Sequence, residues 1–167
     1  MEKNYSNNPA IFEGLCKLLE IKDSDIRNSI LRQGLDAIDK GVHAGGAFSA
    51  VIPMVSLYYG GGMRLNIEQP TEPGQDQFIL SKGHAVAAMA AVYADKGYFD
   101  AALLKGSRSY ESILNGHPGP ILPGVQISTG PLGQGISAAV GLQTLHKNTF
   151  FKSSNSFCLS FITNRPQ

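Results

Sequence analysis

The chain has 167 residues, of which 43% are hydrophobic and 16% charged, and its formal net charge is +1. This length suits one domain with a buried core, and the near-neutral charge excludes the basic surface that nucleic-acid binding requires. The two cysteines, Cys16 and Cys158, lack CxxC spacing, which favours a reducing compartment and argues against a cysteine-based metal site. We find no signal-peptide core and no apolar run long enough to cross a membrane, so a soluble cytoplasmic protein is expected.

Two helices without a functional signal are predicted first. Apolar side chains recur at helical spacing over residues 9–20, and Pro9 suits a first helical turn. Asp23 can cap a second helix that runs to Lys40 and stops at Gly41.

A histidine in a glycine-rich turn follows. The turn VHAGG holds His43 and leads into AFSAVIPMVSLYY, which should be helical, with Pro53 near a first turn or at a kink. The helix dipole favours the neutral imidazole at this position. On its own, His43 fits a structural hydrogen-bonding role better than a catalytic one.

One α/β unit is predicted after the ordered loop at residues 60–77. A short apolar strand, residues 78–80, breaks at SKGH and enters an alanine-rich helix that is apolar on all sides and therefore buried. Lys82 and His84 at the end of the strand suit an anionic group; a solvated lysine and a capping histidine explain them equally well.

A glycine-rich elbow dominates the last third of the chain. One or two short helices are expected over residues 98–115, with a break at Gly106. The stretch GHPGPILPGVQISTGPLGQG, residues 116–135, then contains a predicted strand at 124–128 and precedes a helix at 136–146. Such an elbow either presents backbone N–H groups to a ligand or uses its glycines only to avoid steric clashes in a tight loop. The alternation of helices and strands predicts an α/β fold with parallel strands covered by helices.

Three of the four histidines occupy equivalent local settings. His43, His84 and His117 each stand in a glycine-flanked turn beside a predicted helix or strand end, whereas His146 is explained by the end of a helix. We therefore expect the three turn histidines and the elbow to form one site.

The segments VHAGG, DQFILSKGHA, NGHP and PGVQISTGPLGQGISAAVG resemble transketolase, in the right order over residues 10–147. The resemblance is closest to the N-terminal subunit of transketolases that are split over two chains. It implies a partial three-layer thiamine diphosphate-binding fold, α/β in class, with a short parallel sheet flanked by helices over residues 1–147. Residues 148–167 form an atypical tail with room for one strand at 157–162.

The resemblance also implies an activity. Transketolases are transferases of the pentose phosphate pathway that use thiamine diphosphate and Mg²⁺ to move a two-carbon ketol unit between sugar phosphates. The implied partners are a second copy of the chain or a C-terminal transketolase subunit.

Roles for five residues follow from the same resemblance. His84 would contact the cofactor's diphosphate, and His43 and His117 would face the substrate hydroxyls and the reacting carbon as catalytic groups. Gly130 and Leu132 would place backbone beside the aminopyrimidine of the cofactor.

The sequence departs from the family after Lys147. The family continues to a Gly-Asp-Gly motif that holds Mg²⁺, whereas here no acidic residue follows Glu111, so no metal ligand is expected. This predicts a truncated product whose tail is a shifted or premature ending, with an exposed sheet edge and apolar helix face. A non-catalytic remnant and a small-molecule-binding module remain alternatives to a working transferase segment.

Overall fold

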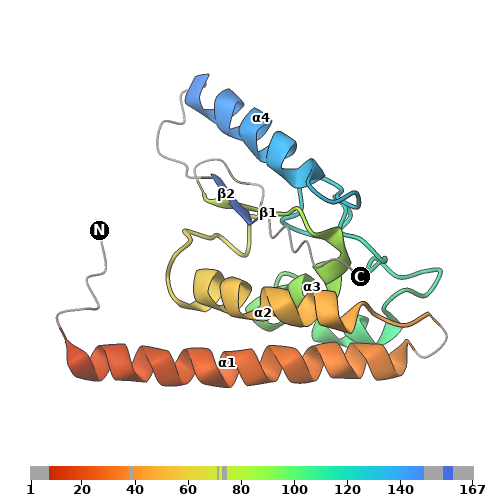
Figure 1. The fold of residues 1–167 in the computed structure, drawn as a ribbon, viewed down its shortest axis with the longest axis horizontal. Coiled ribbons are helices and arrows are strands. Elements are labelled where there is room, and N and C mark those ends of the chain that lie inside the picture. The colour runs from red at the N-terminus through yellow and green to blue at the C-terminus, as the bar shows by residue number, and fades with distance from the viewer. Residues whose placement is uncertain (1–7, 38–39, 71, 73–74, 149–155, 160–167) are drawn as a thin grey trace, which may run out of the picture.

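A computed structural model describes residues 8–37, 40–70, 72, 75–148 and 156–159, and for residues 143, 145–148 and 156–159 it describes the backbone alone. Two parallel strands accompany a mainly helical chain (Figure 1). In chain order the elements are α1 (Pro9–Asp36), α2 (Ala44–Tyr59), β1 (Gln77–Leu80), the 3₁₀ helix η2 (Gly83–Ala85), α3 (Val86–Lys96), the 3₁₀ helix η3 (Ala101–Gly106), α4 (Gln134–Asn148) and β2 (Ser156–Leu159).

The first helix is continuous, so the predicted pair of helices is wrong. Asn8 caps α1 by accepting hydrogen bonds from the N–H groups of Ala10 and Ile11, at 3.1 and 3.4 Å. Asp23 does not cap a second helix, because its carboxylate binds the Arg27 guanidinium one turn later at 2.7 Å. No glycine or proline interrupts residues 20–25, and α1 therefore runs on to Asp36.

The sheet differs from the prediction in its second strand. Residues 124–128 form no strand: Gly124 has a φ of 78°, and the N–H of Val125 bonds the Leu122 carbonyl in a turn. The partner of β1 is β2, which pairs with it in parallel from Gln77 opposite Ser156 to Leu80 opposite Leu159. The strand expected at 157–162 is thus present through Leu159, and residues 160–162 lie outside the described residues.

The remaining local predictions are largely confirmed. β1 and the helices over 44–59 and 86–96 occur where the patterns placed them, and the helix predicted over 136–146 spans 134–148. Pro53 lies in the interior of α2 rather than in its first turn. Between Tyr98 and Asn115, the expected helices reduce to the single 3₁₀ helix η3, which ends at Gly106.

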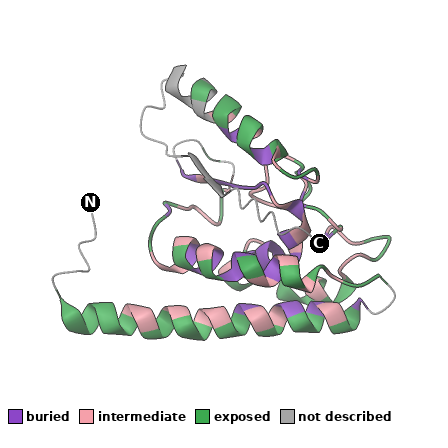
Figure 2. Cartoon of the chain, viewed as in Figure 1, coloured by how far each residue is buried: buried purple, intermediate pink, exposed green. Residues whose placement is uncertain are grey.

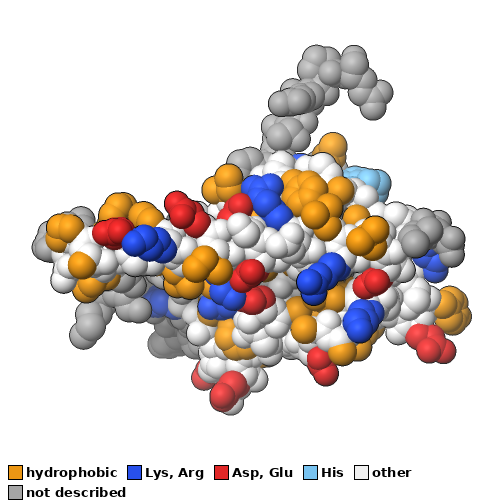
Figure 3. Space-filling model, turned by 90° about the horizontal axis from the view of Figure 1, so that it is seen from below, with side chains coloured by type: hydrophobic (Ala, Val, Ile, Leu, Met, Phe, Trp, Pro, Cys, Tyr) orange, Lys and Arg blue, Asp and Glu red, His pale blue; other side chains and the backbone are white. Residues whose placement is uncertain are grey.

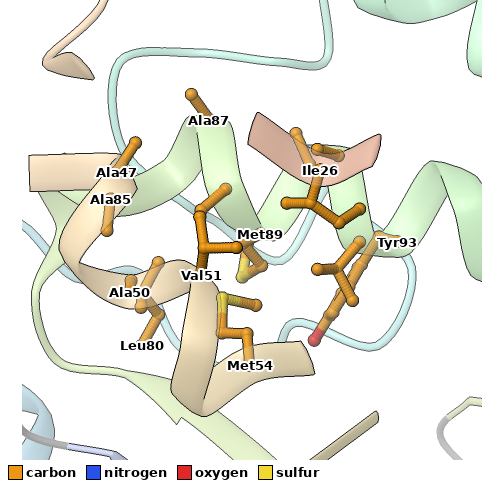
Figure 4. Close-up of a cluster of buried hydrophobic side chains, with 14 of the residues drawn as sticks. Ile26, Ala47, Ala50, Val51, Met54, Leu80, Ala85, Ala87, Met89 and Tyr93 are labelled. Atoms are coloured by element: carbon orange, nitrogen blue, oxygen red, sulfur yellow. The ribbon is translucent and has the colours of Figure 1, made fainter. Parts of the chain in front are cut away.

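The core lies where α1, α2 and α3 meet below β1 (Figures 1 and 4). α3 is buried from Ala87 through Ala94, as its all-apolar sequence predicts. From α1, only Ile26, Ile30 and Gln33 are buried, and the Gln33 amide donates to the Ala87 carbonyl at 3.0 Å. Figure 4 shows side chains of α1, α2, β1 and α3 converging on Val51 and Met89.

A tyrosine cluster closes one end of this core. The hydroxyls of Tyr58 and Tyr93 are 3.0 Å apart, and Tyr93 stacks on Tyr98 with ring centroids 4.4 Å apart. Burial raises the pKa of Tyr58 and Tyr93 and raises that of Tyr98 to about 12, so all three rings stay neutral over the ordinary pH range.

The outer surface of α1 is rich in exposed apolar side chains. Its N-terminal half is largely exposed, and the face seen from below mixes apolar side chains with charged ones (Figures 2 and 3). The exposed apolar residues of α1 are Ile11, Phe12, Leu18, Ile21, Leu31 and Leu35. Ile136 and Val140 are likewise exposed on α4. Within the described part of the chain, no helix has the length and apolar character needed to cross a bilayer.

Candidate functional site

His43 lies at the N-cap position of α2, where its side chain makes no capping hydrogen bond. The first-turn N–H groups of a helix lack intrahelical partners and carry a partial positive charge. Gly46 brings this turn close to the end of β1, because a Cβ there would lie 3.6 Å from Lys82 Cε and 3.7 Å from the His84 carbonyl oxygen. The start of α2 therefore faces the β1–α3 turn.

His84 belongs to that turn, in η2, one residue beyond Gly83. Lys82, two residues before His84, contacts α2: its ammonium donates to the Ser49 hydroxyl of that helix at 2.7 Å. A lysine, an imidazole and a helix N-terminus thus lie together at the carboxyl end of β1, an arrangement suited to an anion.

The structure brings the three turn histidines together. The ring centroids of His43 and His84 are 4.9 Å apart, as are those of His84 and His117, and both contacts are edge-on at 71° and 83°. His84 is half-buried, whereas His43 and His117 are exposed. Partial desolvation, and next the charges of His84, His43 and Arg108, lower the pKa of His117, which favours its neutral form.

Close backbone approaches hold the elbow against this turn. The Thr129 hydroxyl donates to the Leu80 carbonyl at 2.6 Å, and the Gly135 N–H donates to the Ser81 hydroxyl at 3.1 Å. A Cβ on Gly83 would lie 2.7 Å from the Thr129 carbonyl oxygen, and one on Gly135 would lie 2.5 Å from Ser81 Cβ. Glycine is required at both positions because a side chain would push the elbow away.

The two residues assigned to the aminopyrimidine differ in their surroundings. A Cβ on Gly130 would make an ordinary contact with His117, 3.7 Å from its Cδ2 atom, so Gly130 borders the histidine cluster. Leu132 is 72% exposed, and among the described residues no ring contact or hydrogen bond joins it to the histidine cluster. The structure therefore joins four of the five predicted site residues and leaves Leu132 at the margin.

Several polar contacts at the site carry no signal in the sequence. The hydroxyls of Ser49, Ser81 and Thr129 bind groups from other segments, and serine or threonine at such positions has no characteristic spacing. Arg108 is a further residue that sequence reasoning missed. It lines a narrow crevice of about 10 Å³, partly open to solvent, together with His43 and His84.

The chemistry of the cluster is that of proton transfer and anion binding. Neutral imidazoles donate from one ring nitrogen and accept at the other, and histidine titrates near neutral pH. Among the described residues, no three histidine, cysteine or acidic side chains are placed to hold a metal ion.

Comparison with known proteins gives the family. The family model described as "Transketolase, thiamine diphosphate binding domain" matches residues 23–161. Human transketolase (Homo sapiens) is 36% identical over 144 residues, which are 86% of this chain and 23% of that protein. One of the subunits of the apulose-4-phosphate transketolase of Phocaeicola vulgatus is 36% identical over 103 residues, 62% of this chain and 36% of the relative.

Solved structures agree with these relatives. Transketolase from Leishmania mexicana superimposes with a TM-score of 0.71 and 29% identity over 84% of this chain and 22% of that one. A Pichia stipitis transketolase in complex with sedoheptulose-7-phosphate gives 0.70 and 28%, over 84% and 21%. The chain spans about a third or less of the length of these proteins. It belongs to the transketolase family, and its match lies in the thiamine diphosphate-binding domain.

Proposed function

We propose that this chain is the N-terminal segment of a transketolase-type transferase and binds thiamine diphosphate where α2, η2 and the elbow meet. The observation that carries the proposal is the cluster of His43, His84 and His117, with successive rings 4.9 Å apart. When bound, thiamine diphosphate supplies the carbanion chemistry for moving a two-carbon ketol unit between sugar phosphates.

The residues present suit the diphosphate of this cofactor. His84 can donate a hydrogen bond to it, and Lys82 adds a positive charge on the same edge of the sheet. Gly46 leaves room at the first turn of α2, whose N–H groups favour an anion. These features support assigning the diphosphate to the end of β1.

His43 and His117 are the proposed catalytic residues. Both residues are exposed, so a sugar phosphate can reach their rings. The lowered pKa of His117 keeps its ring neutral, so it can accept a proton from a substrate hydroxyl. We assign Gly130 and Leu132 to the aminopyrimidine, which would cover part of the exposed Leu132 side chain.

Magnesium does not fit the described residues. The ion prefers carboxylate and other oxygen ligands in octahedral geometry, whereas the side chains described at the site contribute imidazoles, an ammonium, a guanidinium and hydroxyls. We therefore assign Mg²⁺ no ligand among the residues that the structure describes.

The proposal includes a partner. We infer that residues 1–147 form part of a three-layer cofactor-binding domain, with residues 148–167 as an atypical tail that contributes β2, and that another subunit covers the exposed apolar residues Ile136 and Val140. The partner is a second copy of the chain or a C-terminal transketolase subunit. We also propose a cytoplasmic location, because the number and spacing of the cysteines favour a reducing compartment.

Calorimetric titration with thiamine diphosphate tests the function, with and without Mg²⁺ and a candidate C-terminal subunit. We expect weak binding by the chain alone and stronger binding with the partner. His84→Ala should weaken binding at least tenfold, because a hydrogen bond to a charged group contributes about 1.5–3 kcal/mol. His146→Ala, which changes the fourth histidine, serves as the matched control and should leave the affinity unchanged.

The other outcomes identify the alternatives. No heat of binding in any arm would contradict the proposal and leave a non-catalytic remnant. Binding that is unaffected by His84→Ala would place the ligand elsewhere. Tight binding without ketol transfer in the presence of the partner would favour a small-molecule-binding module.

A further inference from the structure

Arg108 and Lys40 hold each other through reciprocal side chain–backbone hydrogen bonds. The Arg108 guanidinium donates to the Lys40 carbonyl at 2.7 Å, and its Nη1 atom also donates to the Gly41 carbonyl. In return, the Lys40 ammonium donates to the Arg108 carbonyl at 2.7 Å. Residues 68 positions apart in the sequence are therefore joined in both directions.

This pair links the segments that carry two of the three histidines. Gly41 lies two residues before His43. On the other side, the Arg108 N–H donates to the Leu114 carbonyl at 2.7 Å, which closes the loop leading to Gly116 and His117. A Cβ on Gly116 would lie 3.6 Å from Arg108 Nη2, so the guanidinium also lies along the backbone that precedes His117.

The backbone of Arg108 is unusual. Its φ is 65°, and no other non-glycine residue in the described ranges has a positive φ. A side chain in the left-handed region is unfavourable and persists where surrounding contacts determine the conformation. Here those contacts are the bonds to Lys40, Gly41 and Leu114. The strained residue thus coincides with the junction between the two histidine turns.

We propose that Arg108 and Lys40 are positioning residues that set the separation between the His43 turn and the His117 turn. Neither is proposed to touch a reacting atom. The guanidinium is suited to this task because its Nη1 atom donates to two neighbouring carbonyls while the rest of the planar group lies along the backbone at Gly116. This positioning role is argued from these contacts and does not depend on the proposed function. The expected effect on cofactor affinity does rest on the proposed function.

Arg108→Lys is the informative variant, since it keeps a positive charge at this position and removes the planar group that lies along Gly116. Lys40→Met is a second variant that removes only the return bond. Arg32→Lys is the matched control, because Arg32 is an exposed arginine of α1. The chain has four histidines, so NMR of histidine-labelled protein resolves each ring at once.

We expect Arg108→Lys to shift the ring signals of His43 and His117 and to weaken the transfer of magnetisation between His84 and each of them. Lys40→Met should cause smaller shifts of the same signals, and Arg32→Lys should cause none. Thermal unfolding should stay cooperative. Thiamine diphosphate affinity should fall about tenfold with Arg108→Lys, by analogy with the loss seen when the outer-shell support of a metal-binding histidine is removed.

Wild-type histidine signals in folded Arg108→Lys would overturn the proposal. Should Arg108→Lys fail to fold, Lys40→Met decides. Shifted His43 and His117 signals support the positioning role, and unchanged signals contradict it. If the wild type binds no thiamine diphosphate, the proposed function fails, while the ring signals still test the positioning role.

Discussion

Gly83→Ala is expected to lower the free energy of unfolding by about 3 kcal/mol and to abolish thiamine diphosphate binding. The new Cβ would lie 2.7 Å from the Thr129 carbonyl oxygen and 2.9 Å from His117 Cδ2. Because the first of these is a backbone atom, the contact can be relieved only by moving the elbow away from η2. Urea unfolding and calorimetric titration of Gly83→Ala measure the two effects.

The matched control is Gly14→Ala in α1, where an added Cβ meets nothing within 4 Å. Alanine is favoured over glycine in a helix by about 1 kcal/mol, so this variant should be as stable as the wild type or more stable. A Gly83→Ala protein with wild-type stability and affinity would show that the elbow does not pack on η2 as described.

The largest effect in the core is expected for Tyr93→Ala. Tyr93 is 1% exposed, and its loss removes the stacking on Tyr98 and leaves the buried Tyr58 hydroxyl without its partner. Truncating a buried aromatic residue costs about 3–5 kcal/mol, and an unpaired buried hydroxyl adds to this cost. Urea unfolding followed by circular dichroism measures the change.

Tyr93→Phe separates the two contributions, because it keeps the ring and removes only the hydroxyl. It should cost about 1–2 kcal/mol, the penalty for leaving one buried hydroxyl unpaired. Equal losses for the alanine and phenylalanine variants would mean that the ring itself does not stabilise the core.

Local patterns predict the elements that carry their own signal. The helix from Val86 to Lys96 is apolar on every side, and such a helix can only be buried, as observed. The glycine-flanked turns likewise place His43, His84 and His117 at element ends, and the structure brings their rings together. These elements can be predicted from the sequence because each pattern lies within a few neighbouring residues.

The errors arise where distant contacts decide the structure. Residues 124–128 have a β-like composition, yet β1 pairs with β2, more than 70 residues farther along the chain. Asp23 resembles an N-cap, but its ion pair with Arg27 supports the helix interior instead. The contacts of Ser49 and Arg108 join segments far apart in the sequence, and nothing in the local sequence marks them.

The central claim is that three histidines line one thiamine diphosphate site. It is tested most directly by titrating the cofactor into histidine-labelled protein and following the four ring signals by NMR. We predict that the signals of His43, His84 and His117 shift together with a single dissociation constant, while that of His146 stays in place. Shifts confined to His146, different dissociation constants for the three rings, or no shift at millimolar cofactor would contradict the claim.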